Sequence, residues 1–325
     1  MISVDTIIVG GGPAGSSCAW RLRRHGVDCL VLDRAEFPRP KLCAGWVTPK
    51  VLRDLELAPD EYPLGFLTFE ALRLAFKGVG FTLRTVQHSI RRIEFDAWLL
   101  ARSGATVATH NVRQIRRDGD WYVLDEAYRC RHLVGAGGTR CPVQRALFRE
   151  IAPRDEALQA AVLEEEFPYE WNDGTCRLWF FERGLPGYAW YVPKAGGHLN
   201  VGIGAMAQQL KAKHDTIRPH WQRLTDKLAT DGLVRERDWD AGGYTYYLRP
   251  RQDVVRREEA FLVGDSAGLS TRDLCEGIGP AVRSGLLAAD AIATGGTYAL
   301  DRVRAHSVKQ SLVRRGLDWA FCGRA

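Results

Sequence analysis

The stretch VDTIIVGGGPAGSSCAWRLRRHGVDCLVLD, residues 4–33, decides the fold of this chain. It reads as an apolar strand rich in β-branched residues, a glycine-rich turn, a helix that follows Pro13, and a second apolar strand. The turn spaces its glycines as G-x-G-x-x-G, at Gly10, Gly12 and Gly15. This order of elements predicts a βαβ opening.

The same spacing is typical of a dinucleotide site. The first glycine permits the turn, the second lets the backbone approach a pyrophosphate, and the third lets the helix pack closely on the strand. The phosphates would lie at the positive end of the helix. Asp33 ends the second strand, 23 positions after Gly10, where a carboxylate can accept hydrogen bonds from a ribose diol. This motif alone does not separate FAD from NAD.

A second glycine region does separate them. AFLVGDSAG, residues 260–268, places Asp265 at the end of a strand, and Gly277 and Ile278 follow 12 and 13 positions later at a predicted helix start. A carboxylate there can bind a ribityl hydroxyl, and the helix start can place N–H groups near a flavin pyrimidine ring. FAD needs contacts from both ends of a chain, whereas an NAD site would be completed locally. The two regions together therefore favour FAD.

Between these motifs the sequence changes character. Residues 34–90 read as irregular, and RRIEFDAWLLARSG at 91–104 predicts an amphipathic helix. Residues 160–250 are rich in aromatic side chains and alternate in polarity, which predicts an antiparallel sheet inserted into the first domain. We expect an α/β fold with a Rossmann-like FAD-binding domain at 1–160 and 251–300 (part of 50–90 contributing to the substrate side), an inserted antiparallel β-sheet substrate domain at 161–250, and a helical tail at 301–325.

Composition excludes several classes of protein. The 325 residues are 46% apolar and 26% charged, which is ordinary for a soluble globular protein. The net charge of +6 is spread along the chain and does not suggest nucleic-acid binding. No window approaches 18 consecutive apolar residues, and the eight cysteines contain no C-x-x-C pair, which argues against a membrane span and structural zinc. We expect a cytoplasmic protein without a bound metal, and contact with a membrane surface stays open.

Several segments in register resemble the flavoprotein group with the p-hydroxybenzoate hydroxylase fold, and within it the geranylgeranyl reductase family, which neighbours flavin-dependent halogenases and monooxygenases. They cover the chain from residue 4 to about 294. The matching segments are GGGPAG with Asp33 and Arg34, PRPKLCAG at 38–45, RRIEFDAWLL at 91–100, LVGAGGTRCPV at 133–143, LPGYAWYVPK at 185–194 followed by LNVGIG, and AFLVGDSAG with CEGIGPAVRSG.

The resemblance implies a non-covalent FAD and a set of cofactor contacts. Ala14 and Gly15 would meet the pyrophosphate, Asp33 the adenosine ribose, and Val112 the adenine through its backbone. Arg92 matches the arginine of the family's R-x-x-F-D motif near the cofactor. The whole implied cofactor-binding set is Gly10, Gly12, Ala14, Gly15, Asp33, Arg34, Cys43, Ala44, Arg92, Val112, Asp265, Gly277 and Ile278.

Three departures from the family pattern bear on substrate identity. Asp33 replaces the commoner Glu, Gly137 replaces Asp in the usual G-A-D-G, and Cys275 stands where a glycine usually precedes the Glu-Gly pair.

Cys43 is the candidate catalytic residue. It follows Lys41 and precedes Gly45, so a nearby cation and a flexible backbone could place a reactive thiol beside the flavin. A buried, inert cysteine would look the same in sequence. Both interpretations stay open.

Tyr188, Trp190 and Tyr191 are the candidate substrate-binding residues. They alternate between the faces of a predicted strand, so not all of them can line one cavity, and such aromatics also form sheet cores. In the resembling fold the substrate sheet covers the flavin, and an apolar aromatic wall suits a prenyl or aromatic substrate.

The leading hypothesis is an FAD-dependent reductase of carbon–carbon double bonds in an isoprenoid or similar apolar substrate. Reduced FAD would deliver hydride from N5 to one alkene carbon, and an acid not identified by the sequence would supply the proton. No second dinucleotide fingerprint appears, so NAD(P)H or another reductant, or an electron-donor protein, would act transiently.

Two alternatives stay open. YAWYVP resembles the halogenase pattern W-x-W-x-I-P, with Tyr188 in place of the first Trp, which would fit an oxygenating monooxygenase or halogenase. Lys77 lies in the region of a halogenase catalytic lysine and is better explained as a solvated lysine beside Gly78. The second alternative is a non-enzymatic flavin-binding electron carrier, and the aromatic insert argues against it.

Overall fold

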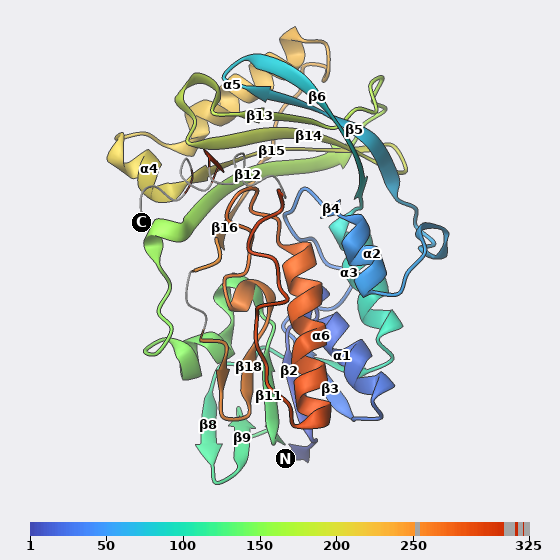
Figure 1. The fold of residues 1–325 in the computed structure, drawn as a ribbon, viewed down its shortest axis with the longest axis vertical. Helices are drawn as coiled ribbons and strands as arrows, with labels where there is room; N and C mark the ends of the chain where they lie inside the picture. The colour runs from blue at the N-terminus through green and yellow to red at the C-terminus, as the bar shows by residue number, and fades with distance from the viewer. Residues whose placement is uncertain (251–253, 309–315, 318–320, 322–325) are drawn as a thin grey trace. The chain divides into compact units, whose positions relative to one another are not determined.

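The computed structural model describes residues 1–250, 254–308, 316–317 and 321 (Figure 1). They form two compact units, each built from separate stretches of the chain. The first contains residues 1–40, 93–155 and 247–307, and the second contains residues 41–92, 156–246 and the described part of 308–325.

The first unit contains the predicted βαβ opening. β2 (Thr6–Val9) leads through the glycine turn into α1 (Pro13–Arg24) and then into β3 (Cys29–Asp33), which pairs with β2 in parallel. Both strands are fully buried, as expected for a parallel sheet covered on both faces. The six-stranded sheet has the order β17 (Arg256–Arg257), β18 (Ala260–Leu262), β11 (His132–Gly135), β2, β3 and β7 (Thr106–Thr109), and only β17 is antiparallel to its neighbour.

Two helices of this unit start at the two glycine motifs and pack on each other. α6 (Ile278–Thr294) begins at the predicted residue and lies beside α1 (Figure 1). A Cβ on Gly285 of α6 would lie 2.2 Å from the carbonyl oxygen of Ala14 in α1, so only glycine allows this approach. α3 (Arg92–Arg102) forms where the amphipathic pattern predicts it, with Phe95 and Leu99 fully buried.

A small sheet completes the first unit. Its order is β1 (Ile2–Ser3), β10 (Tyr128–Cys130), β9 (Trp121–Leu124) and β8 (Ile115–Asp118). Its buried side chains share a core with those of β2, β3 and β11, and Cys141 belongs to that core with no exposed surface.

The second unit is an eight-stranded, mainly antiparallel sheet, as predicted from the aromatic insert. β13 and β5 pair in parallel, and the pairs β12–β15, β15–β14, β14–β13, β5–β6 and β6–β4 are antiparallel. The order is β16 (Gly242–Tyr247), β12 (Gln159–Pro168), β15 (His198–Met206), β14 (Gly187–Lys194), β13 (Arg177–Phe180), β5 (Leu67–Phe76), β6 (Val79–Ser89) and β4 (Trp46–Val47).

One face of this sheet is covered by α5 (Ile217–Thr230) (Figure 1). Trp221 and Leu224 of α5 pack with Tyr191 and Val201 of the sheet in one core. Two shorter helices, α2 (Pro49–Asp54) and α4 (Ala207–Ala212), belong to the same unit.

The expectation that residues 34–90 are irregular is wrong. They contain α2 and the long β5–β6 hairpin, whose alternating pattern FEALRLAFKGVGFTLRTV reverses at Lys77 and Gly78. Both turn residues have positive φ, +47° and +86°, as a two-residue type I′ turn requires. Because β5 and β6 bond into the eight-stranded sheet, residues 41–92 lie in the second unit.

The predicted helical tail at 301–325 lies largely outside the described residues. Residues 301–308 are turns, bends and irregular backbone. Within the described part of the chain, no helix combines the length and the apolar character that crossing a membrane requires.

Candidate functional site

The first glycine turn is built so that only glycine fits its key positions. Gly10 has φ +115°, and a Cβ there would lie 2.4 Å from the carbonyl oxygen of Ala136. A Cβ on Gly15 would lie 1.9 Å from the carbonyl oxygen of Gly10. The turn is therefore pressed against the end of β11 and against the first turn of α1.

Gly12 differs, because the space beside it is open. Among the described residues, the nearest atom to a Cβ built there is an Arg39 guanidinium nitrogen at 3.7 Å. Gly12 is the N-cap of α1, and among the described residues neither a side-chain cap nor an acidic residue occupies this first turn. Uncapped N–H groups at an open, positive helix end fit a pyrophosphate.

Asp33 stands at the end of β3 with its carboxylate 8% exposed. Oδ2 accepts the Gly11 N–H at 2.7 Å, and Oδ1 accepts the Ala35 N–H at 3.0 Å. Each oxygen keeps a second lone pair, so the carboxylate can accept ribose hydroxyls while it fixes the glycine turn. Arg34, the next residue, is exposed.

The second glycine motif forms the other half of the predicted FAD site. Gly264 has φ +56° and donates its N–H to Ser284 Oγ at 2.9 Å. Asp265 is half-buried, and its Oδ1 lies 3.5 Å from the position of a Cβ on Gly277. The carboxylate and the N-terminus of α6 are therefore neighbours in space, as the FAD hypothesis requires.

The fold brings the two halves together inside the first unit. A Cβ on Gly264 would lie 3.0 Å from the Cβ of Ala14, although the two residues are about 250 positions apart in sequence. This region thus offers an open helix N-terminus, the Asp33 carboxylate at the end of β3, and a second carboxylate beside another helix start. These residues fit FAD.

Glu276 is a residue of this region that the sequence reasoning missed. Its Oε1 accepts the Gly279 N–H at 2.6 Å and so satisfies one free donor of α6. Burial raises the pKa of its carboxyl to about 7. The preceding Cys275 has φ +51°, a conformation that favours glycine, which explains why the family usually has glycine there.

Other implied contacts lie elsewhere. Val112 has its side chain in the core of the first unit. Arg92 is the first residue of α3, and it is 7% exposed. Like Cys43 and Ala44, it belongs to the second unit. Arg91, the residue before Arg92, forms an ion pair with Glu166 at 3.0 Å.

A buried lysine, Lys194, holds the segment that carries Cys43 through hydrogen bonds to main-chain carbonyl groups. Lys194 Nζ donates to the carbonyl oxygens of Ala44 and of Ile90, the latter at 2.9 Å. Gly45 has φ +64°, and a Cβ on it would lie 2.0 Å from the same Ile90 oxygen. The Gly45 N–H points at Cys43 Sγ at 3.4 Å, so the thiol is held by its own loop.

The cation next to Cys43 in sequence is engaged elsewhere. Lys41 Nζ lies 3.3 Å from the centre of the Tyr244 ring and donates to Tyr246 Oη at 3.3 Å. Lys194 is the buried cation behind the loop, and burial lowers the pKa of its ammonium group. The sequence argument for a neighbouring cation thus holds for a different lysine.

A buried carboxyl group supports the same loop. Glu164 of β12 is 2% exposed, and its carboxylate accepts hydrogen bonds from the Asn200 side chain and from the Cys43 main chain. Asn200 Oδ1 in turn accepts the Trp190 indole N–H at 2.7 Å. Burial raises the pKa of Glu164 to about 7. Glu164 is the first of three consecutive glutamates. Such a run is typical of a solvent-exposed strand, so the sequence does not indicate that Glu164 is buried and supports the Cys43 loop.

The structure divides the three candidate aromatic residues. Tyr188 and Trp190 lie on one face of β14, with Phe180 and Leu178 of β13 opposite them in register. Tyr191 lies on the other face, fully buried in the core with α5. Since successive strand residues alternate, Tyr191 is a core residue and not part of the wall that Tyr188 and Trp190 form.

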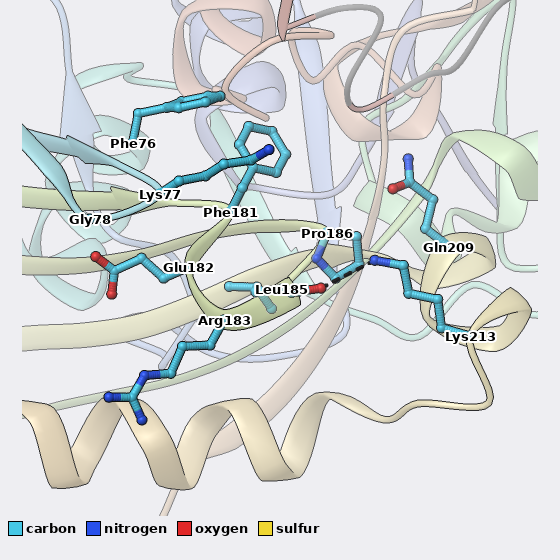
Figure 2. A pocket seen from close by; sticks show the side chains of 11 residues that line it. Phe76, Lys77, Gly78, Phe181, Glu182, Arg183, Leu185, Pro186, Gln209 and Lys213 are labelled. Carbon is cyan, nitrogen blue, oxygen red and sulfur yellow. Dashed lines mark hydrogen bonds between the residues drawn. The ribbon is translucent and has the colours of Figure 1, made fainter.

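A pocket of about 830 Å³ lies in the second unit (Figure 2). The β5–β6 turn and the segment between β13 and β14 form its sides. Its lining residues are Phe76, Lys77, Gly78, Phe181, Glu182, Arg183, Gly184, Leu185, Pro186, Gln209 and Lys213. Lys77 is exposed at the hairpin turn, as expected of a solvated lysine.

Comparison with known sequences gives consistent relatives. A family model described as an NAD(P)-binding Rossmann-like domain matches residues 8–48. An uncharacterized protein of Methanosarcina barkeri is 30% identical over 99% of this chain and 83% of its own length. A menaquinone reductase of Mycolicibacterium smegmatis is 28% identical (90% and 77% covered), and a geranylgeranyl diphosphate reductase of Rhodobacter capsulatus is 26% identical (88% and 74%).

Solved structures share the fold. A geranylgeranyl bacteriochlorophyll reductase-like protein of Thermoplasma acidophilum superposes with a TM-score of 0.77 at 20% identity, covering 90% of this chain and 78% of that one. A flavin-dependent brominase superposes with a TM-score of 0.72 at 19% identity, covering 91% and 80%.

The named relatives identify an FAD-dependent oxidoreductase, and its fold combines a Rossmann-like domain with an inserted β-sheet domain. The chain belongs to the geranylgeranyl reductase family.

Proposed function

We propose that this protein uses FAD to reduce carbon–carbon double bonds in a long prenyl chain. The observation that carries the proposal is the apolar face of the eight-stranded sheet. The residues in register across that face are Trp190 and Tyr188 on β14, Leu178 and Phe180 on β13, and Leu74 and Phe76 on β5.

The shape of this face favours a chain over a compact ring. Neighbouring strands are about 4.8 Å apart, so the apolar track from β14 across β13 to β5 is about 10 Å wide. The Tyr188 ring lies tilted against the rings of Trp190 and Phe180, and the distances between ring centres are 5.7 and 5.2 Å. A flexible apolar chain can lie along such a track and exclude water from it.

The named relatives support the same substrate class. Two of them are named for menaquinone and for geranylgeranyl diphosphate. An isoprenoid chain is what those two molecules share. The wall residues would bind and orient such a chain.

The chemistry would divide between cofactor and protein. FAD, when bound, supplies the hydride, and NAD(P)H, another reductant or a donor protein would reduce it transiently. Cys43 is our candidate for the group that hands a proton to the alkene. Glu164 and Lys194 hold the loop that carries it.

Product analysis tests the reaction class. The FAD-loaded protein is incubated with a prenyl substrate, a reductant and ¹⁸O-labelled O₂, and the product mass is measured. We expect about two mass units gained per double bond, since one hydride and one proton are added. A product that carries labelled oxygen, or a halide when halide is supplied, would replace the reductase with the oxygenase alternative.

A matched pair of variants tests the wall. Tyr188→Ala should raise KM for the prenyl substrate about tenfold and leave reduction of the flavin intact, because the lost contact is largely uniform binding. Tyr191→Phe, on the opposite face, should leave KM unchanged. Thermal melts of both variants come first. Equal KM values in folded variants would remove Tyr188 from the substrate wall.

A further inference from the structure

The half of the β5–β6 hairpin nearest its turn has one apolar face. Residues opposite each other across an antiparallel pair share a face, so the register defines it. The pairs are Leu72 with Leu83, Leu74 with Phe81, and Phe76 with Val79. The other face carries Arg73 and Ala75 opposite Thr82 and Gly80.

This apolar face is exposed toward the tip of the hairpin. Val79 is 72% exposed, Phe81 53%, Phe76 44% and Leu83 40%. Large apolar side chains gathered in this way mark an interaction surface, because isolated ones are common but clusters are not. Beyond its contact with β4 at Ser89 and His88, β6 is the outer strand of this part of the sheet.

Cations lie in the hairpin turn and in the pocket beside it. Lys77 stands in the hairpin turn, and Arg183 and Lys213 line the adjoining pocket, which has Glu182 as its acidic lining residue (Figure 2). The lining of that pocket also has apolar residues. Among them, the Phe181 ring packs edge-on against the Phe76 ring, with 5.3 Å between ring centres. The surface therefore combines apolar side chains with an excess of positive charge.

We propose that the tip of the β5–β6 hairpin docks on an anionic phospholipid bilayer. Val79 and Phe81 enter the region between headgroups and acyl chains, and Lys77, Arg183 and Lys213 contact lipid phosphates. Amphipathic elements bind membrane surfaces through this combination of buried apolar area and attraction to anionic headgroups.

The charge favours a bilayer over a second copy of the chain. A dimer that buried this apolar face against a second copy would place two surfaces with an excess of positive charge against each other, whereas an anionic surface neutralises that charge. Membrane docking is measured without turnover. The docking proposal can therefore fail while the proposed reductase activity stands, and the reductase proposal can fail while the docking stands.

The test is co-sedimentation of the full-length, FAD-saturated protein with phosphatidylcholine vesicles that contain or lack phosphatidylglycerol. We expect binding to the anionic vesicles that weakens as salt is added. The double variant Val79→Ser/Lys77→Glu should bind them at least about tenfold more weakly. Absent binding of the unaltered protein would overturn the proposal.

A control with the same chemistry lies in the first unit. Val107→Ser/Arg149→Glu changes an exposed valine, 43% exposed, and an exposed arginine by the same kinds of substitution. It should keep binding within about twofold of the unaltered protein. Equal losses in both double variants would show a general charge effect and overturn the proposal. Light scattering that shows a dimer lost in Val79→Ser/Lys77→Glu would assign the face to a second copy instead.

Discussion

Asp265 is the residue on which the FAD assignment depends most. Its carboxylate lies beside Gly277, and the Ser270 hydroxyl approaches Oδ1 at 3.4 Å. Asp265→Ala should therefore weaken FAD about tenfold to a hundredfold, the value of a charged hydrogen bond. The apoprotein should lose little stability. Isothermal titration with FAD and melting of the apoprotein measure the two effects.

Ser270→Ala is the control for Asp265. It removes the hydroxyl neighbour and leaves the carboxylate, so FAD affinity should stay within about threefold. If Asp265→Ala destabilises the apoprotein as much as it weakens FAD, the carboxylate serves packing and the ribityl contact is wrong.

Cys275 carries local backbone strain that glycine would relieve. A side chain at φ +51° costs about 1 to 2 kcal/mol, and part of that gain is offset because glycine frees the unfolded chain. Cys275→Gly should stabilise the protein by about 0.5 to 1 kcal/mol. At a fixed FAD concentration, the melting temperature should rise roughly 1 to 3 °C.

Cys275→Ala separates strain from the loss of the thiol. Alanine keeps the Cβ at the strained φ, so this variant should show no rise. A rise of equal size in both variants would trace the effect to the sulfur.

At the scale of elements, β12 holds a buried acid that makes stability depend on pH. Burial raises the pKa of Glu164 to about 7 in the folded chain, above its ordinary value. The folded state then binds the proton more tightly than the unfolded state, so this contribution is complete at low pH and is lost as pH rises through about 7. Relative to Glu164→Gln, the unaltered protein should lose up to about 3 kcal/mol between pH 5 and pH 8.

Thermal or urea unfolding of both proteins across that pH range measures the difference. Glu165→Gln is the control, because its carboxylate points to the opposite face of β12 and pairs with Arg237. Parallel pH curves for the unaltered protein and Glu164→Gln would contradict a buried acid that ionises near neutrality.

The elements differ in how far the sequence predicts them. β2, α1 and β3 follow from apolar runs and glycines that act within 30 residues, and α6 begins at the predicted Ile278. The β5–β6 hairpin was missed although its alternation is regular, because the surrounding proline and glycine residues suggested a loop. Its turn, Lys77 and Gly78, lacks the Asn-Gly pair that most clearly marks a hairpin.

The site shows the same division. Asp33 and Asp265 could be predicted, because each ends a strand at a fixed spacing from glycines. Glu164 and Lys194 could not, because their burial depends on pairing of β12, β15 and β14 and on the return of the Cys43 loop. No sequence pattern close to Glu164 or Lys194 indicates this strand pairing or the position of the Cys43 loop.

At the scale of the whole molecule, each unit is discontinuous in sequence. The first unit closes only when α6 packs against α1, so FAD binding should report on completion of that unit. The second unit carries the apolar track and the hairpin. We propose that the protein performs one chemical step, hydride transfer from flavin to a prenyl double bond.

An anaerobic single turnover tests that claim most directly. The FAD of the protein is reduced, excess reductant is removed, and a prenyl substrate is added without oxygen while the flavin absorbance is followed. We predict that the flavin reoxidises and that one double bond is saturated for each flavin oxidised. Flavin that stays reduced until oxygen enters, followed by an oxygenated product, would contradict it.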